Sequence, residues 1–392
     1  MTSLTGTVNR VIEQVRKHGD HALCDFAWRF DKVCLKPAQL LVSAEELKRA
    51  QKRVSASFLK AIRECAHQIE GFALAERKRL PRSWFERQGS MGRGQLIRPV
   101  DSVGIYVPGG RFPYPSTVLM TVIPAKVAGV LRIVVATPPK NLTPEVMAAA
   151  HLAGCQAVYR AGGASAIAAL AYGTPRIPKV DFIVGPGNQY VTEAKRMVYG
   201  QVGIDSLAGP SEVVILADRQ TPVSFIVNDL QAQAEHDPEA SALLLSTDRA
   251  LLREARQHLD RLVGGRVRFK FVHSWEEATE EVNAIGPEHL ELLIRNPQRV
   301  LSKIRHAGAI FLGPSSPAAM GDYVGGPSHV LPTNGAARFS SGLSVATFLK
   351  RSSVMGFQAR PGERNSWEAA LTMAQSEGME YHEKSLQCRI SR

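Results

Sequence analysis

The sequence predicts an α/β protein with two parallel β-sheets, each covered by helices. From residue 132 onward, short apolar runs alternate with helical stretches of ~10–15 residues, the rhythm of parallel strands joined by crossover helices. This rhythm restarts near residue 212, which indicates a second sheet rather than an enlarged first one. A chain of 392 residues has room for two or three domains of ~100–200 residues each.

The apolar runs place the strands and helices of both units. In the first unit, strands are predicted at 133–137, 157–162 and 180–187. A helix is predicted at 143–153, a second helix follows the second strand and ends at Leu170, and a third follows the third strand and ends at Val198. In the second unit, strands are predicted at 212–218, 242–247, 268–272, 291–294 and 309–313, with helices at 222–236, 248–262, from Ser274, and at 297–307.

The N-terminal region, residues 5–80, is predicted to be helical. Val8, Ile12 and Val15 are spaced for one apolar face, and Gly19 ends that run. Ser43-Ala-Glu-Glu has the pattern of a capping box, and a long helix is expected at 57–79.

The segments on either side of the two units carry weaker signals. Strands are expected at 96–100 and 103–107, joined by a short turn. From Val345 the chain is expected to be mostly helical, with a helix near 366–377.

Composition argues against several classes of protein. Hydrophobic residues make up 44% and charged residues 21%, as in ordinary globular proteins. The net charge is +12, but the basic residues are scattered, which favours a solvated surface and no nucleic-acid partner. No apolar window is long enough for a membrane span, and the first residues lack the apolar core of a signal peptide. The five cysteines form no CxxC pair and are odd in number, which favours a reducing cytoplasmic location over a disulfide framework.

Two glycine-rich loops follow predicted strands. Tyr106-Val-Pro-Gly-Gly contains paired glycines, which let the backbone approach a ligand closely. Gly185-Pro-Gly-Asn188 precedes a helix, whose N-terminus can receive phosphate. Neither loop contains GxGxxG, and taken alone each is more often a plain turn. Their position after strands of one sheet favours a ligand crevice.

Several polar clusters could hold a metal or transfer protons. Gln233 and His236 are three residues apart and share a helix face, although a single histidine on a helix is usually structural. The adjacent Glu288 and His289 could supply base and acid, although this dipeptide is common by chance. Asp322 could be a turn residue. Spacing alone therefore indicates an α/β enzyme with a possible metal.

Taken together, the strings resemble the histidinol dehydrogenase family. VGIYVPGG, VLMTVIPAKVAGV, IPKVDFIVGPGN, GQVGIDSLAGPSEVVILAD, GPEHLEL and GDYVGGPSHVLPT occur in family order, and weaker similarity extends from about residue 8 to 390. The resemblance implies a homodimer with two incomplete Rossmann-like domains, small helical arms and a swapped C-terminal arm. It implies an NAD-binding domain at 106–210, a catalytic domain formed by 1–105 with 211–343, and a helical arm at 344–392.

The resemblance also implies an activity, cofactors and site residues. The expected reaction is oxidation of L-histidinol, an amino alcohol, to L-histidine through a bound aldehyde, with Zn²⁺ and two NAD. The implied zinc ligands are Gln233, His236, Asp322 and His382, the last reaching the zinc of the partner subunit. These four residues, with Ser211, Glu288, His289, His329 and Glu377, would contact the substrate. Glu288 and His289 would be the catalytic acid/base pair, and Tyr106, Ser165 and Asn188 would line the dinucleotide site.

The chain departs from the family at one dinucleotide position. Ser165 stands in GGASA where the family usually has Gln, and the shorter side chain loses most of the reach to the cofactor. The chain also starts later than typical members. Both departures leave open an alternative, an NAD-dependent dehydrogenase of the same fold for another small alcohol such as a sulfonated propanediol.

Overall fold

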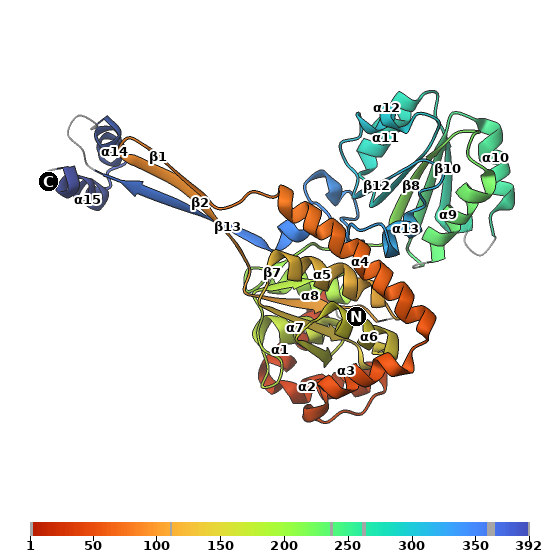
Figure 1. Cartoon of the computed structure of the whole chain (residues 1–392), viewed down its shortest axis with the longest axis horizontal. Helices are drawn as coiled ribbons and strands as arrows, with labels where there is room; N and C mark the ends of the chain where they lie inside the picture. Colours follow the sequence, from red (N-terminus) through yellow and green to blue (C-terminus); the bar gives the residue numbers. More distant parts are fainter. Residues whose placement is uncertain (1–2, 110–111, 236–237, 261–263, 359–364, 391–392) are drawn as a thin grey trace. The chain divides into compact units, whose positions relative to one another are not determined.

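A computed structural model describes residues 3–109, 112–235, 238–260, 264–358 and 365–390, and the chain divides into two units (Figure 1). The larger unit comprises Met1–Lys78 and Val100–Phe348, and the smaller comprises Arg79–Pro99 and Leu349–Arg392. None of the described helices is long and apolar enough to cross a membrane.

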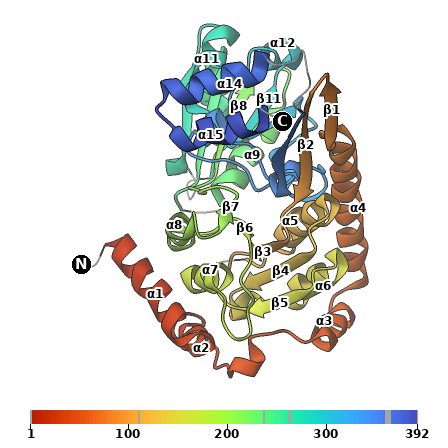
Figure 2. The same cartoon turned by 90° about the vertical axis from the view of Figure 1, so that its left-hand side faces the viewer.

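The first sheet of the larger unit has five parallel strands among the described residues, in the order β5-β4-β3-β6-β7. Its strands are β3 (Ser102–Tyr106), β4 (Arg132–Thr137), β5 (Ala157–Arg160), β6 (Phe182–Val184) and β7 (Gly203–Ile204). Its helices are α5 (Pro115–Ala128), α6 (Pro144–Ala153), α7 (Gly163–Tyr172) and α8 (Gln189–Val198). Figure 2 shows α7 and α8 on one face and α5 and α6 on the other. Both faces are therefore buried, which explains the nearly continuous apolar strands.

The second sheet also has five parallel strands in the described chain, in the order β10-β9-β8-β11-β12. Its strands are β8 (Glu212–Ala217), β9 (Ser241–Ser246), β10 (Val267–Phe271), β11 (His289–Leu293) and β12 (Ala309–Leu312). Its helices are α9 (Val223–Glu235), α10 (Arg249–His258), α11 (Trp275–Ile285), α12 (Pro297–Leu301) and α13 (Ala318–Tyr323). One apolar core joins the sheet to α9 and α10, and another joins it to α11 and α12. The predicted fold class is confirmed.

Four α-helices form most of the N-terminal part of the chain. They are α1 (Leu4–His18), α2 (Asp20–Phe26), α3 (Ala44–Ala50) and α4 (Ala56–Arg79). As predicted, α1 buries Val8, Ile12 and Val15 and ends at Gly19, and the capping box at Ser43 begins α3. The apolar face of α1 packs on α7 and α8, and α3 packs on α6. Strand β3 pairs with β4 and β6, so the first strand of this sheet begins at Ser102.

The smaller unit contains an antiparallel sheet that the sequence did not reveal. Strands β1 (Trp84–Gln88), β2 (Met91–Pro99) and β13 (Leu349–Phe357) pair in that order and are followed by α14 (Asn365–Ser376) and α15 (Glu380–Ile390) (Figure 1). In place of a hairpin between 96–100 and 103–107, β2 pairs with β13 while β3 enters the first sheet. The C-terminal part was expected to be mostly helical from Val345, but Leu349–Phe357 is the strand β13, because distant β2 supplies its hydrogen-bond partners.

Candidate functional site

The candidate acid/base pair lies at the amino ends of two adjacent strands. Glu288 directly precedes β11 and His289 begins it, while Ser211 and Glu212 stand at the start of β8. Because β8 and β11 are parallel neighbours, their starts meet. The backbone N–H of Glu212 donates to Glu288 Oε2 across 3.1 Å, and the Ser211 side chain also hydrogen-bonds Glu288. The fold thus brings three predicted site residues together.

Burial controls the proton affinity of Glu288. The residue is 6% exposed, and desolvation raises the pKa of its carboxyl to about 8. The hydrogen bonds from Glu212 and Ser211 lower that pKa, while the nearby charges of Glu212 and Asp322 raise it. His289 Nδ1 lies 3.8 Å from Glu288 Oε2. A carboxyl with a pKa near neutrality beside an imidazole can give and take protons at working pH.

An aromatic contact places α13, and with it Asp322, beside this pair. The ring of Phe311 on β12 lies 6.0 Å from the ring of His289, measured between centroids. The tip of the Phe311 ring also packs against Gly321, where a Cβ would come within 2.7 Å of the ring. Gly321 lies within α13, so the absence of a Cβ lets the Phe311 ring approach this helix closely, and Asp322 is a helical residue rather than a turn residue.

His329 joins the site through Asp322. Its Nδ1 lies 3.7 Å from Asp322 Oδ1 and 3.3 Å from the Asp322 carbonyl oxygen. Its Nε2 lies 3.1 Å from the hydroxyl of Thr117 on α5, a helix of the first sheet. The predicted substrate residue His329 thus lies where the helices of the first sheet meet the candidate site.

The amide of Gln233 fits a metal-binding role. Gln233 is 4% exposed on α9, and its Nε2 has no hydrogen-bond partner among the described residues. The amide oxygen and nitrogen can exchange places, so a buried amide end without a partner could direct its oxygen to a cation. Helix α13, which carries Asp322, packs against α9. An amide, a carboxylate and imidazoles form a donor set that Zn²⁺ accepts.

The structure does not place the remaining predicted site residues beside Gln233 and Asp322. His236 lies outside the described residues. Within the described ranges, no three His, Cys, Asp or Glu side chains gather as a metal site. His382 lies on α15 and Glu377 follows α14, and both are exposed residues of the smaller unit. Their part in the site stays a prediction.

The predicted dinucleotide residues lie at the carboxyl edge of the first sheet. The hydroxyl of buried Tyr106 accepts a hydrogen bond of 3.0 Å from Gly163 N, and burial raises its pKa to about 12. The hydroxyl of Ser165 donates to the carbonyl oxygen of Gly162 across 2.8 Å. Asn188 caps α8 by accepting from the N–H groups of Tyr190 and Val191. All three side chains therefore form hydrogen bonds with backbone groups at this edge of the sheet.

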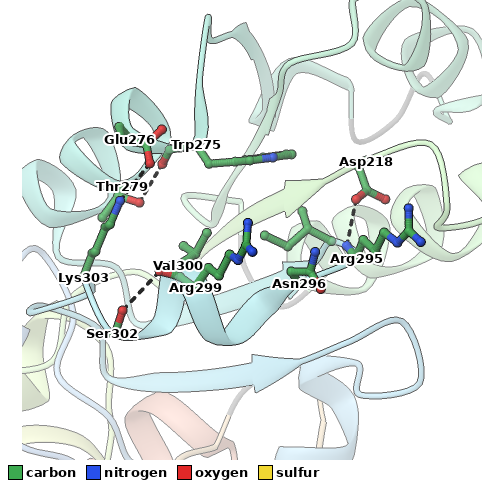
Figure 3. A pocket seen from close by; sticks show the side chains of 11 residues that line it. Asp218, Trp275, Glu276, Thr279, Arg295, Asn296, Arg299, Val300, Ser302 and Lys303 are labelled. Atoms are coloured by element: carbon green, nitrogen blue, oxygen red, sulfur yellow. Dashed lines mark hydrogen bonds and ion pairs between the residues drawn. The ribbon is translucent and has the colours of Figure 1, made fainter.

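A separate cavity lies at the other edge of the second sheet. It measures about 620 Å³ and stands at the carboxyl ends of β8 and β11, near Asp218 and Arg295. Figure 3 shows Trp275 of α11 and Arg299 of α12 lining it. The Glu288–His289 pair is at the opposite, amino end of β11, so this cavity is not part of the candidate site.

Two charged residues that sequence reasoning missed lie beneath the dinucleotide loops. Lys195 and Asp205 form a buried ion pair, with side chains 2% and 4% exposed. A signal for Lys195 was available, because it falls on the apolar face of α8 with Val191 and Val198. A lysine at a buried helix position usually has an acidic partner. Glu212, within the Ser211 cluster but not assigned a role, also contacts Glu288.

The fold is that of an α/β enzyme with two parallel sheets, and the candidate site places a buried carboxyl beside an imidazole at the start of β11. A family model for histidinol dehydrogenase matches residues 1–390. The chain therefore belongs to the histidinol dehydrogenase family, a family of oxidoreductases, as its resemblance predicted.

Individual relatives agree along the whole chain. The histidinol dehydrogenase of a Synechococcus species is 48% identical over 401 residues, covering 98% of this chain and 91% of the relative. That of Thermosynechococcus vestitus is 47% identical over 408 residues, covering 100% and 94%. The crystal structure of histidinol dehydrogenase from Elizabethkingia anophelis superposes with a TM-score of 0.92 at 35% identity, covering 100% of this chain and 93% of that one.

Proposed function

We propose that this chain oxidises L-histidinol to L-histidine through a bound aldehyde, with NAD as the oxidant in two successive steps. The buried Glu288–His289 pair is the observation that carries the proposal, because each oxidation requires a group that accepts a proton. Family membership supplies the substrate class.

The proposed dinucleotide site is the crevice between β3 and β6. These strands are adjacent in the first sheet. From β3 the chain passes to β4 on one side of the pair, and from β6 it passes to β7 on the other side. Parallel sheets bind ligands at such a reversal of strand order. NAD, when bound there, would accept the hydride that leaves the substrate carbon. At this edge Tyr106 ends β3, Ser165 lies in the first turn of α7, and Asn188 caps α8.

The proposed zinc ligands are Gln233, His236, Asp322 and, from the swapped arm of a homodimer, His382 of the partner subunit. Zinc, when bound, would hold the amine and hydroxyl of the substrate and polarise the reacting oxygen. The buried amide of Gln233 and its proximity to the helix of Asp322 support the first part of this set.

The acid/base residues would act in sequence. His289 would take the hydroxyl proton as the alcohol becomes the aldehyde. Glu288 would then take a proton from a water that adds to the aldehyde carbon, which forms the gem-diol as its monoanion for the second oxidation. Its pKa of about 8 suits this exchange, and the bonds from Ser211 and Glu212 stabilise the ionised form.

An alternative is the same chemistry on another small alcohol, such as a sulfonated propanediol. Ser165 motivates it, because its hydroxyl is bonded to Gly162 within the loop rather than directed outward as a long amide would be. The test is NAD reduction with L-histidinol, L-histidinaldehyde and the sulfonated diol, each with and without a chelator. Turnover of the diol with none of L-histidinol would replace the proposed substrate, and no turnover of either would reject both.

A further inference from the structure

A buried ion pair holds the loop that follows β6. Lys195 on α8 and Asp205 after β7 face one another with almost no solvent exposure. Charges removed from water need hydrogen bonds to replace their hydration. Here these hydrogen bonds come from backbone groups of Gly185 and Ser206.

Both backbone groups of Gly185 are bonded to the pair. The ammonium of Lys195 donates to the Gly185 carbonyl oxygen across 3.0 Å, and Gly185 N donates to Asp205 Oδ2 across 2.8 Å. Gly185 has a φ of +116°, and a Cβ there would come within 2.1 Å of the Tyr106 carbonyl oxygen. The glycine is thus fixed against β3 on one side and by the ion pair on the other.

The same pair lies at the start of the segment that connects the two sheets. The second carboxylate oxygen of Asp205 accepts a hydrogen bond of 2.7 Å from Ser206 N. Further along this segment, the Ala208 carbonyl oxygen accepts from Thr192 on α8, and Gly209 N donates to Thr333. The segment ends at the Ser211 that contacts Glu288.

We propose that Lys195 and Asp205 are positioning residues that hold the Gly185–Asn188 loop in its NAD-binding form and fix it to the segment that leads to Ser211. This inference rests on the proposed NAD site. In this proposal neither Lys195 nor Asp205 contacts the substrate or the cofactor directly. An apolar pair could fill the same space, but it could not bond both backbone groups of Gly185, which is the reason for charges at this position.

The test compares the double variant Lys195→Met/Asp205→Leu with the wild-type enzyme. Replacing both partners of a buried pair by apolar residues is often tolerated, so the fold should survive while the loop loses its anchors. We expect the KM and the dissociation constant for NAD to rise about ten-fold or more, with kcat and the KM for L-histidinol nearly unchanged. Asp205→Asn, which keeps shape and loses charge, should give a smaller rise and serves if the double variant fails to fold.

Hydrogen exchange supplies a readout that does not depend on turnover. When exchange is measured in the absence of NAD, the backbone amide of Gly185 should exchange faster in the variants than in the wild type. The reason is that its hydrogen-bond acceptor, the Asp205 carboxylate, is removed or weakened. Arg196→Met is the matched control, since Arg196 is the next residue of α8, is exposed, and forms its ion pair with Glu193 rather than with Asp205. Folded variants with wild-type NAD affinity and exchange would overturn the inference. A wild-type enzyme that neither binds nor reduces NAD would instead reject the proposed function, and this inference with it.

Discussion

The backbone N–H of Glu212 donates a hydrogen bond to the carboxylate of Glu288 across 3.1 Å, so the first residue of β8 holds the residue that precedes β11. This contact stabilises the ionised form of a carboxyl whose pKa burial raises to about 8. The start of β8 therefore favours the ionised form of the Glu288 carboxyl, in opposition to burial.

Glu288→Gln should slow aldehyde oxidation by ~10²–10⁴-fold, and His289→Asn should mainly slow alcohol oxidation. Supplying L-histidinaldehyde directly separates the two steps. Because Glu288 must be ionised to act as a base, the rate of aldehyde oxidation by the wild-type enzyme should fall as the pH decreases below about 8. This decrease with pH should be absent in Glu288→Gln. Glu280→Gln, at an exposed position, is the control. A wild-type aldehyde rate in Glu288→Gln would refute the assignment.

Zinc should bind at about one ion per chain. Exhaustive chelation should abolish turnover and added Zn²⁺ should restore it, because the ion would hold the substrate. Gln233→Leu keeps the size of the buried side chain but removes its oxygen, so metal analysis after dialysis should find less zinc. The exposed Gln298→Leu should retain it. Full activity of a verified metal-free preparation would contradict this prediction.

The proposed swapped arm can be tested by complementation. His382→Ala chains and His236→Ala chains should each be inactive, because each lacks a proposed zinc ligand. In a mixed dimer, one site would carry both lesions and the other neither, so mixing should restore part of the activity. Subunit exchange must be demonstrated with differently tagged chains. If exchange occurs and activity stays absent, the ligands do not come from two subunits.

Ser165→Gln should lower the KM for NAD by roughly 2- to 13-fold, the range for one hydrogen bond of ~0.5–1.5 kcal/mol. The Ser165 hydroxyl donates to Gly162, whereas a longer amide would reach beyond the loop. The KM for the alcohol should change little. Steady-state kinetics with each substrate varied in turn measure both constants. An unchanged or raised KM for NAD would favour a reshaped pocket and the alternative substrate.

A buried carboxyl pair should make stability depend on pH. Burial, and then the charge of Asp229, raise the pKa of Glu291 to about 8 in the folded chain. The folded state then binds more protons than the unfolded state above the ordinary glutamate pKa, so stability should fall as pH rises toward about 8. Urea midpoints across this range should fall less in Glu291→Gln. A slope equal to that of wild type would show that Glu291 does not contribute.

Local signals in the sequence were sufficient for much of the fold and for part of the site. The apolar face of α1, its end at Gly19 and the capping box of α3 depend on residues within a turn or two of one another. Most strands of the two parallel sheets could be predicted because burial on two faces requires continuous apolar runs, whereas the two-residue strand β7 (Gly203–Ile204) was not. The Glu288–His289 dipeptide was likewise visible as a candidate, although its burial was not.

Only the tertiary structure decided which distant segments meet. Strand β13 exists because β2 supplies hydrogen-bond partners, and its largely exposed residues gave no strand pattern of their own. The pKa of Glu288 depends on the start of β8, and the burial of Lys195 depends on Asp205 beyond the end of its helix. Hydrogen bonding, desolvation and charge pairing act through space, so their strength at a residue is set by neighbours that its sequence position does not identify.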